Sequence, residues 1–182
     1  MSVHSRPPGE FRAFYQDVYD DVLRFAQRRT ESAERAEDAV ADALLVAWRR
    51  FADAPAAHGD RRAWLFGIVR NTLLNAGRSH ARQAAVAVRV QNAGDVMGRD
   101  HADDSGRRID LVRAWRSLGA EHQEVLALTV FEQLNSRQAA VVLGISSVAY
   151  RARLSRARRL LRAHLDEPAS PAGIPFSTEA RR

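Results

Sequence analysis

The sequence predicts an all-α protein in which two small helical domains are joined by a flexible linker. Apolar residues recur at helical spacing wherever their pattern is regular, and no convincing strand alternation occurs along the chain. Between about residues 81 and 108 this periodicity decays into Ala, Gly, Asp, Asn and Arg, which is typical of a linker. A chain of 182 residues with 46% apolar content can bury two small cores.

The first domain is expected as three helices over residues 10–80, after an N-terminal tail of residues 1–9. Asp60 stands just before the third apolar stripe, where an N-cap is needed. The stripe positions expected in the core are Phe11, Phe14, Tyr15, Val18, Val22, Phe25, Val40, Leu44, Ala47, Trp48, Phe51, Trp64, Leu65, Ile68, Val69 and Leu73.

The second domain is expected over residues 109–165. Helical periodicity resumes at Ile109, breaks at Gly119 and ends near Asn135, and two further helices follow. Residues 166–182 contain three prolines and are expected to form a disordered tail.

Residues 136–162 carry the spacing of a helix-turn-helix motif. Ser136 can cap a short helix, Gly144 supplies a tight turn, and Ser146 or Ser147 can cap a longer helix. The second helix of such a motif reads the major groove. The apolar stripe expected on this reading helix is Tyr150, Leu154, Ala157 and Leu161. The arginines expected on its exposed face are Arg151, Arg153, Arg156, Arg158, Arg159 and Arg162.

An ordinary helical hairpin with an arginine-rich exterior is the structural alternative to this motif. A stable helix exterior normally intersperses Glu among its basic residues for ion pairing. Residues 136–165 contain seven Arg and no acid. The DNA-reading interpretation is therefore favoured, because guanidinium groups suit both guanine edges and phosphate oxygens.

The charge of the chain is segregated into blocks. All 28 basic residues are Arg, against 22 acidic residues, which gives a formal charge of +6. Residues 61–89 form a second acid-free block with six Arg, whereas residues 31–42 contain five acids and one Arg. Two acid-free blocks favour a polyanionic partner. The acidic segment would repel DNA and suits a basic protein partner instead.

Composition also excludes several functional classes. The chain has neither Cys nor Lys, which removes disulfides, thiolate zinc sites, cysteine nucleophiles, P-loops and Schiff-base lysines. Its six His share no metal-like spacing, and no Ser lies in a Gly-flanked elbow. We expect no catalytic residue, enzyme activity, cofactor, metal or small-molecule substrate. Without a long apolar run or a signal peptide, we expect a cytoplasmic protein with no membrane insertion.

Specific segments of both halves match a known pattern. Residues 36–49 read Ala-Glu-Asp-Ala-Val-Ala-Asp-Ala-Leu-Leu-Val-Ala-Trp-Arg, residues 143–146 read Leu-Gly-Ile-Ser, and residues 153–159 read Arg-Leu-Ser-Arg-Ala-Arg-Arg. In these segments and in their order, the chain resembles the extracytoplasmic-function (ECF) sigma factors of bacterial RNA polymerase, in the sigma-70 family. The resemblance covers about residues 10–165.

The resemblance implies a role for each domain. The first domain is similar to sigma region 2, a helical bundle that binds core polymerase and recognises and melts the −10 element. The residues that would contact the β and β′ subunits of core polymerase are Asp38, Asp42, Leu44 and Leu45. The residues that would serve the −10 element are His58, Asp60, Arg61, Arg62, Arg70, Asn71, Asn75 and Arg78.

The second domain is similar to sigma region 4, whose helix-turn-helix reads the −35 element of promoter DNA. The resemblance also implies an anti-sigma factor as a partner, which the family often has. The residues expected to contact the −35 element are Ser147, Tyr150, Arg151, Arg153 and Arg156.

Two other functions remain open at this point. A stand-alone helix-turn-helix repressor or activator would need a dimerisation or ligand-sensing surface in its first domain, where this chain offers an acidic helix beside a basic one. A helical adaptor without a DNA role does not explain the seven unopposed Arg of residues 136–165.

Overall fold

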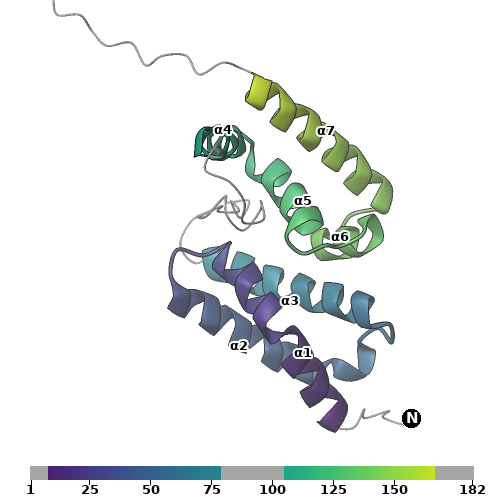
Figure 1. Cartoon of the computed structure of the whole chain (residues 1–182). Coiled ribbons are helices and arrows are strands. Elements are labelled where there is room, and N and C mark those ends of the chain that lie inside the picture. Colours follow the sequence, from purple (N-terminus) through teal and green to yellow (C-terminus); the bar gives the residue numbers. More distant parts are fainter. Residues whose placement is uncertain (1–7, 79–104, 167–182) are drawn as a thin grey trace, which may run out of the picture.

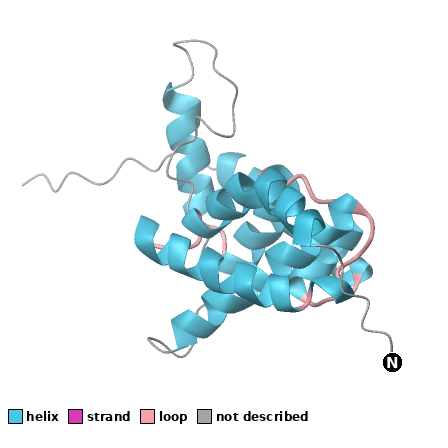
Figure 2. Cartoon of the chain, turned by 90° about the horizontal axis from the view of Figure 1, so that it is seen from below, coloured by secondary structure: helices cyan, strands magenta, loops and turns pink. Residues whose placement is uncertain are grey.

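The computed structural model describes residues 8–78 and 105–166, and every regular element within these ranges is helical (Figure 1, Figure 2). The predicted all-α fold class is confirmed, while most of the predicted tails and of the predicted linker lies outside the described residues; Pro8, Gly9 and Asp166, expected in the tails, are helical. The elements are α1 (Pro8–Gln27), α2 (Ala33–Arg49), the short 3-10 helix η1 (Phe51–Asp53), α3 (His58–Arg78), α4 (Ser105–Arg116), α5 (Ala120–Val130), α6 (Ser136–Leu143) and α7 (Ser147–Asp166).

The cap of α6 is one residue earlier than expected. The side chain of Asn135, rather than Ser136, accepts a hydrogen bond from the backbone N–H of Gln138 at 3.0 Å. The Gln138 side chain in turn accepts from the Asn135 N–H at 3.2 Å, which completes a capping box. Both partners are polar and three residues apart, so the sequence carried this signal.

Three other helix starts also differ from, or refine, the sequence expectation. Helix α4 begins at Ser105, four residues before the expected Ile109. Asp60 lies in the first turn of α3 and does not precede it. At α7 the first of the two serines is the cap, because the Ser146 hydroxyl accepts from the Ala149 N–H at 3.1 Å.

Helices α1, α2 and α3 enclose the core of the first domain. Most of the expected core positions are buried, among them Phe25 and Phe51. Trp48 was expected in the core but is 47% exposed, and its ring meets Phe11 edge-on with centroids 5.0 Å apart. Its neighbour Ala47 faces the core, and one step along a helix turns the next side chain by about 100°.

The two domains are docked on each other through α3. One side of α3 packs on α2 and another on α6, so that α3 lies in the middle of the molecule in Figure 1. The approach is close at Gly67, where a Cβ would stand 3.7 Å from the Cα of Val142 in α6, an ordinary contact distance. Buried apolar residues of both domains form one continuous cluster. The sequence predicted two tethered domains, and the structure adds their contact.

The turn between α6 and α7 depends on Gly144, as expected. Its φ of +65° lies in the left-handed region, and the N–H of Ile145 reaches back to the carbonyl of Ala140 at 3.0 Å. Apart from the residues on either side, no atom of the described residues lies within 4 Å of a Cβ placed at Gly144. A side chain at this position would therefore strain the backbone without causing a clash.

Gly144→Ala is expected to lower the free energy of unfolding by about 1 kcal/mol, because an L-residue is disfavoured in the left-handed region. Urea denaturation followed by circular dichroism measures the change. Gly9→Ala is the matched control, since Gly9 is helical, has an ordinary φ and also has open space at its Cβ. Equal effects of the two substitutions would contradict the conformational explanation.

Candidate nucleic-acid interface

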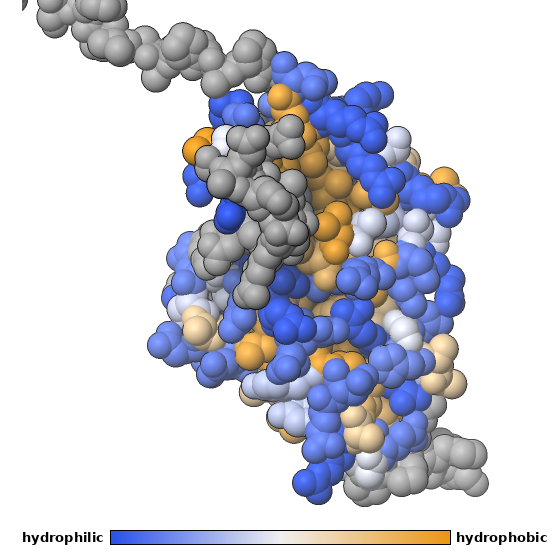
Figure 3. Space-filling view, in the orientation of Figure 1, coloured by the Kyte–Doolittle hydropathy of each residue, from blue (hydrophilic) through white to orange (hydrophobic). Residues whose placement is uncertain are grey.

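Arginines cover most of the solvent-exposed side of α7. All six predicted guanidinium side chains are exposed, and none of them forms a hydrogen bond or ion pair with another described residue. Figure 3 shows the resulting hydrophilic surface over α7, at the upper right. The opposite face of the helix is held by the buried residues Tyr150, Leu154 and Ala157. The arginines are thus presented on a rigid element with their donors free.

Tyr150 was expected among the DNA contacts, and that prediction is wrong. Its side chain is fully buried, and its hydroxyl donates to the carbonyl of Val125 at 2.8 Å beside the Thr129 hydroxyl at 2.7 Å. Burial raises the pKa of Tyr150 above its ordinary value, against the lowering effect of the Thr129 hydrogen bond. Tyr150 therefore fixes α7 to α5. Ser147 is half-buried at the first turn of α7.

Near this first turn the structure shows two apolar side chains that the sequence reasoning did not select. Val148 of α7 is 67% exposed, and Val141 of α6 is also exposed. The sequence could have predicted the exposure of Val148, since Val148 does not lie on the apolar stripe of α7 that begins at Tyr150. Exposed apolar groups beside arginines suit a groove in which thymine methyl groups lie next to phosphates.

The basic face of α3 is directed at the second domain. Arg70 forms a two-pronged ion pair with Glu124 of α5, with Nε–Oε1 and Nη2–Oε2 distances of 2.7 and 3.1 Å. Arg62 donates to the backbone carbonyl of Glu132 at 2.8 Å and to Asp21 of its own domain at 2.9 Å. Two of the arginines predicted for the −10 element are therefore already paired in this conformation.

Glu132 is the centre of this contact, and its side chain is only 1% exposed. The guanidinium of Arg28 donates to both of its carboxylate oxygens at 3.0 Å, and Arg29 approaches it at 3.6 Å. Burial lowers the pKa of Arg29 to about 10, although Glu132 and Glu124 act to raise it. The sequence reasoning missed this cluster, because its members are up to 104 residues apart.

A second charged contact joins the two domains near the start of α3. We call the whole contact between the domains, from Asp60 to Arg70 of α3 and including Arg28, Arg29, Glu124, Glu132 and Arg137, the seam. Asp60 accepts from Arg137 at 2.6 and 2.8 Å and from Gln138 at 3.2 Å, both in the first turn of α6. Hydrogen bonds from Arg137 and then Gln138 hold the pKa of Asp60 below its ordinary value. His58 remains exposed, with its Nε2 2.6 Å from a carboxylate oxygen of Asp17.

Arg61 was also expected to contact DNA, but it is buried and its contacts stabilise its own domain. Its Nε and Nη2 donate to the carbonyls of Pro55 and Ala56, and its Nη1 lies 3.1 Å from Glu10. Its three guanidinium nitrogens therefore tie the segment that contains Pro55 and Ala56 to α1. Three predicted residues of this site remain. Asn71 and Asn75 are exposed, and the side chain of Arg78 lies outside the described residues.

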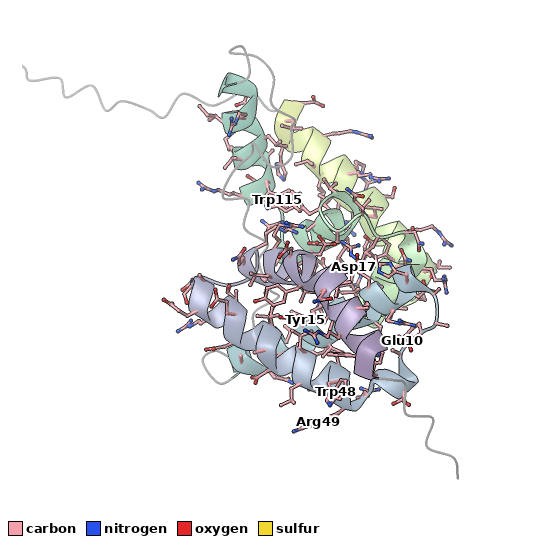
Figure 4. All side chains as sticks on the ribbon, turned by 60° about the horizontal axis from the view of Figure 1, so that its bottom comes forward. Glu10, Tyr15, Asp17, Trp48, Arg49 and Trp115 are labelled. Carbon is pink, nitrogen blue, oxygen red and sulfur yellow. The ribbon has the colours of Figure 1, made fainter. Side chains whose placement is uncertain are left out.

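Helix α2 presents an acidic and apolar face to solvent. Asp38, Asp42 and Leu45 follow at helical spacing on one face; both acids are exposed, and Leu45 is 50% exposed. Leu44, expected beside them, is half-buried against the core. Figure 4 shows Arg49 projecting outward beside Trp48, at the far end of the helix.

The described residues contain neither a membrane-spanning helix nor a metal-binding cluster. None of the helices in residues 8–78 and 105–166 is both long and apolar enough to cross a membrane. The same ranges contain no group of three or more side chains able to share a metal ion.

Family comparisons agree with this arrangement of helices and charges. Residues 14–83 match the model of sigma-70 region 2, and residues 108–161 match that of sigma-70, region 4. The ECF RNA polymerase sigma factor SigL of Mycobacterium tuberculosis is 33% identical over 162 residues, which cover 86% of this chain and 89% of SigL. The RNA polymerase sigma factor CnrH of Cupriavidus metallidurans is 33% identical over 174 residues, which cover 87% and 89%.

Solved structures share the fold. The sigma factor RpoE of Bartonella quintana, in complex with the anti-sigma factor NepR, superposes with a TM-score of 0.60 at 23% identity, covering 86% of this chain and 96% of RpoE. CnrH in complex with the cytosolic domain of CnrY gives a TM-score of 0.59 at 23% identity, covering 89% and 91%. By family models, sequence identity and coverage, the chain belongs to the ECF group of the sigma-70 family and is an RNA polymerase sigma factor.

Proposed function

We propose that α7 reads the −35 element of the promoters to which this sigma factor directs RNA polymerase. The observation that carries this proposal is the group of exposed arginines on α7 with no acidic partner among the described residues. Arginine near the start of a reading helix can bind a guanine edge with two hydrogen bonds, and arginine farther along can bind phosphates. We assign this role to Ser147, Arg151, Arg153 and Arg156 in a region 4 domain of residues 109–165.

The first domain, residues 10–80, would bind core polymerase and open the −10 element. The exposed acids and Leu45 of α2 support a contact with the β and β′ subunits, because an apolar centre with flanking charges gives both affinity and register. Arg62 and Arg70 of α3 support binding of the −10 strand, together with His58, Asp60, Asn71, Asn75 and Arg78.

The remaining partners follow from the same proposal. We expect a cytoplasmic protein that needs promoter DNA and core polymerase and performs no catalysis of its own. The relatives solved as complexes with NepR and CnrY lead us to expect an anti-sigma factor for this chain also.

Run-off transcription tests the whole function. Purified core polymerase, this chain and a linear template carrying the upstream DNA of its own gene should give a discrete transcript only when all three are present. Tight and specific binding to that DNA without core polymerase, and no transcript, would instead favour a stand-alone regulator.

The arginines of α7 and the buried Tyr150 are expected to respond oppositely to substitution. Each of Arg151→Gln, Arg153→Gln and Arg156→Gln should weaken binding of the holoenzyme to −35 duplex by about 1–3 kcal/mol for a base contact. A lost phosphate contact should also reduce the salt slope by about one. Fluorescence anisotropy at several salt concentrations measures both quantities.

Tyr150→Phe should leave DNA affinity unchanged and lower the free energy of unfolding by about 1 kcal/mol, because it removes a buried hydroxyl with two hydrogen-bond partners. Urea denaturation of the chain gives this value. Loss of DNA binding in Tyr150→Phe at full stability would be inconsistent with its buried position.

The face of α2 is expected to determine affinity for core polymerase. Leu45→Ala should weaken that binding by roughly 1–2 kcal/mol through lost apolar contact, and Asp42→Asn should slow association, most clearly at low salt. Biolayer interferometry with immobilised core polymerase resolves the two effects. Asp20→Asn removes an exposed acid of α1 and serves as the control; an equal loss in this variant would show that only net charge matters.

A further inference from the structure

We propose that Val148 contacts the 5-methyl group of a thymine in the −35 element, so that this chain selects an A·T pair at the base pair met by the first turn of α7. The inference rests on the proposed function, which assigns α7 to the −35 element. It adds a specificity-determining residue that has no hydrogen-bonding side chain, and it gives the base that this residue selects.

Val148 is an apolar side chain exposed at the start of the reading helix. It is 67% exposed, more than any other valine among the described residues. Its neighbour Tyr150 supplies the buried contact with α5, so the methyl groups of Val148 are not used to hold the fold. A single exposed valine is common on protein surfaces. At the N-terminal end of a reading helix, however, the side chains contact base edges.

The outward side of α7 is uncharged along its centre in the first turns. Successive residues of a helix are turned by about 100°, which places Val148, Ala152 and Ser155 opposite the buried stripe that Tyr150 begins. All three are exposed. We call these three residues the uncharged strip. It is the part of α7 that points directly away from the core.

Arginines lie on both sides of the uncharged strip. Arg151 is on one flank and Arg156 on the other; both are exposed and have no acidic partner among the described residues. Their guanidinium groups can reach guanine edges or phosphate oxygens. The strip itself offers methyl groups and one hydroxyl. A base edge beneath Val148 is therefore selected by an apolar contact, while the flanking arginines supply the hydrogen bonds.

Thymine is the base that matches an apolar contact in the major groove. Its C5-methyl group lies at the groove edge, whereas cytosine presents an amino donor and the purines present N7 with O6 or N6. A valine placed against those polar groups would remove water from them without replacing the hydrogen bonds. Against the thymine methyl group, the same valine buries apolar surface on both partners.

This surface is available while the two domains are docked. Helix α7 packs on α4, α5 and α6 of its own domain, and Figure 1 shows it on the outer side of that domain. Val148 is not part of the seam. Because its side chain is largely exposed, shortening it should change the reading of bases without disturbing the core or the contact between the domains.

Replacing thymine by deoxyuridine removes the 5-methyl group and keeps the base pair. Holoenzyme made from core polymerase and the native chain is titrated with −35 duplexes from the promoter used in run-off transcription, each with one thymine replaced. One replacement should weaken binding about two- to fourfold, as expected for the loss of one buried methyl group. If no single replacement weakens binding, Val148 does not read a thymine methyl group.

Val148→Ala identifies the side chain that contacts this methyl group. The variant should bind the thymine and deoxyuridine duplexes equally, because alanine is too short to keep the contact. Val148→Thr keeps the branched shape and one methyl group, so it should retain part of the preference. Val130→Ala removes the same atoms from an exposed valine of α5 and should retain all of it. A full preference for thymine in Val148→Ala would assign the methyl group to another residue and overturn the proposal.

5-Methylcytosine separates the reading of a methyl group from the reading of hydrogen-bonding groups. At the position found with deoxyuridine, 5-methylcytosine should bind about two- to fourfold more tightly than cytosine in the native chain. Val148→Ala should bind these two duplexes equally. If the native chain also binds them equally, the methyl contact is refuted.

Run-off transcription separates these outcomes from failure of the proposed function. A native chain that directs specific initiation but does not distinguish thymine from deoxyuridine retains the proposed function and loses the thymine contact. A chain that directs no initiation and binds no promoter duplex loses both. Circular dichroism of the Val148 variants checks that α7 remains folded.

Discussion

The arrangement of the two domains depends on a few buried charges, Glu124 and Glu132 with their arginines, that are paired across the contact between the domains. Glu132 is almost completely buried and is paired with Arg28 and Arg29. Removing these partners would lower the stability of the docked arrangement by roughly 3–5 kcal/mol, because the carboxylate would be left buried and unpaired. Apolar contact around Gly67 determines how closely α3 and α6 approach. The two-pronged pair of Arg70 with Glu124 has narrower geometry, so it determines the register in which α3 meets α5.

Local pattern predicts most of the helices, and long-range packing explains where it fails. The stripes and turn of residues 136–162 were readable because periodicity and Gly144 act over a few residues. The contact between the domains could not be predicted from the sequence, because Glu124 and Arg70 are 54 residues apart and no local pattern connects them. Tyr150 and Arg61 were assigned to DNA by residue type, whereas their burial depends on neighbours from other helices and loops.

The same residue type serves two purposes in this chain. Arg70 is matched by a carboxylate within hydrogen-bond distance, whereas Arg151 and Arg156 on α7 have none among the described residues. Arg70 and the α7 arginines have the same side chain. They differ in whether an acidic residue lies within hydrogen-bond distance. The charge blocks of the sequence identify α7 correctly as an exposed basic surface but describe α3 only in part, because α1 and α5 supply acids that pair with its arginines.

The choice of arginine at position 29 has a consequence for how the molecule responds to acidity. Its guanidinium keeps its proton at any pH found in a cell, since its pKa remains about 10 even when buried. A lysine starts from a pKa of about 10.4, and a similar loss on burial would bring its titration close to neutrality. With arginine, this positive charge between the domains is constant near neutral pH. Mild acidification would therefore leave the positive charge of Arg29 unchanged.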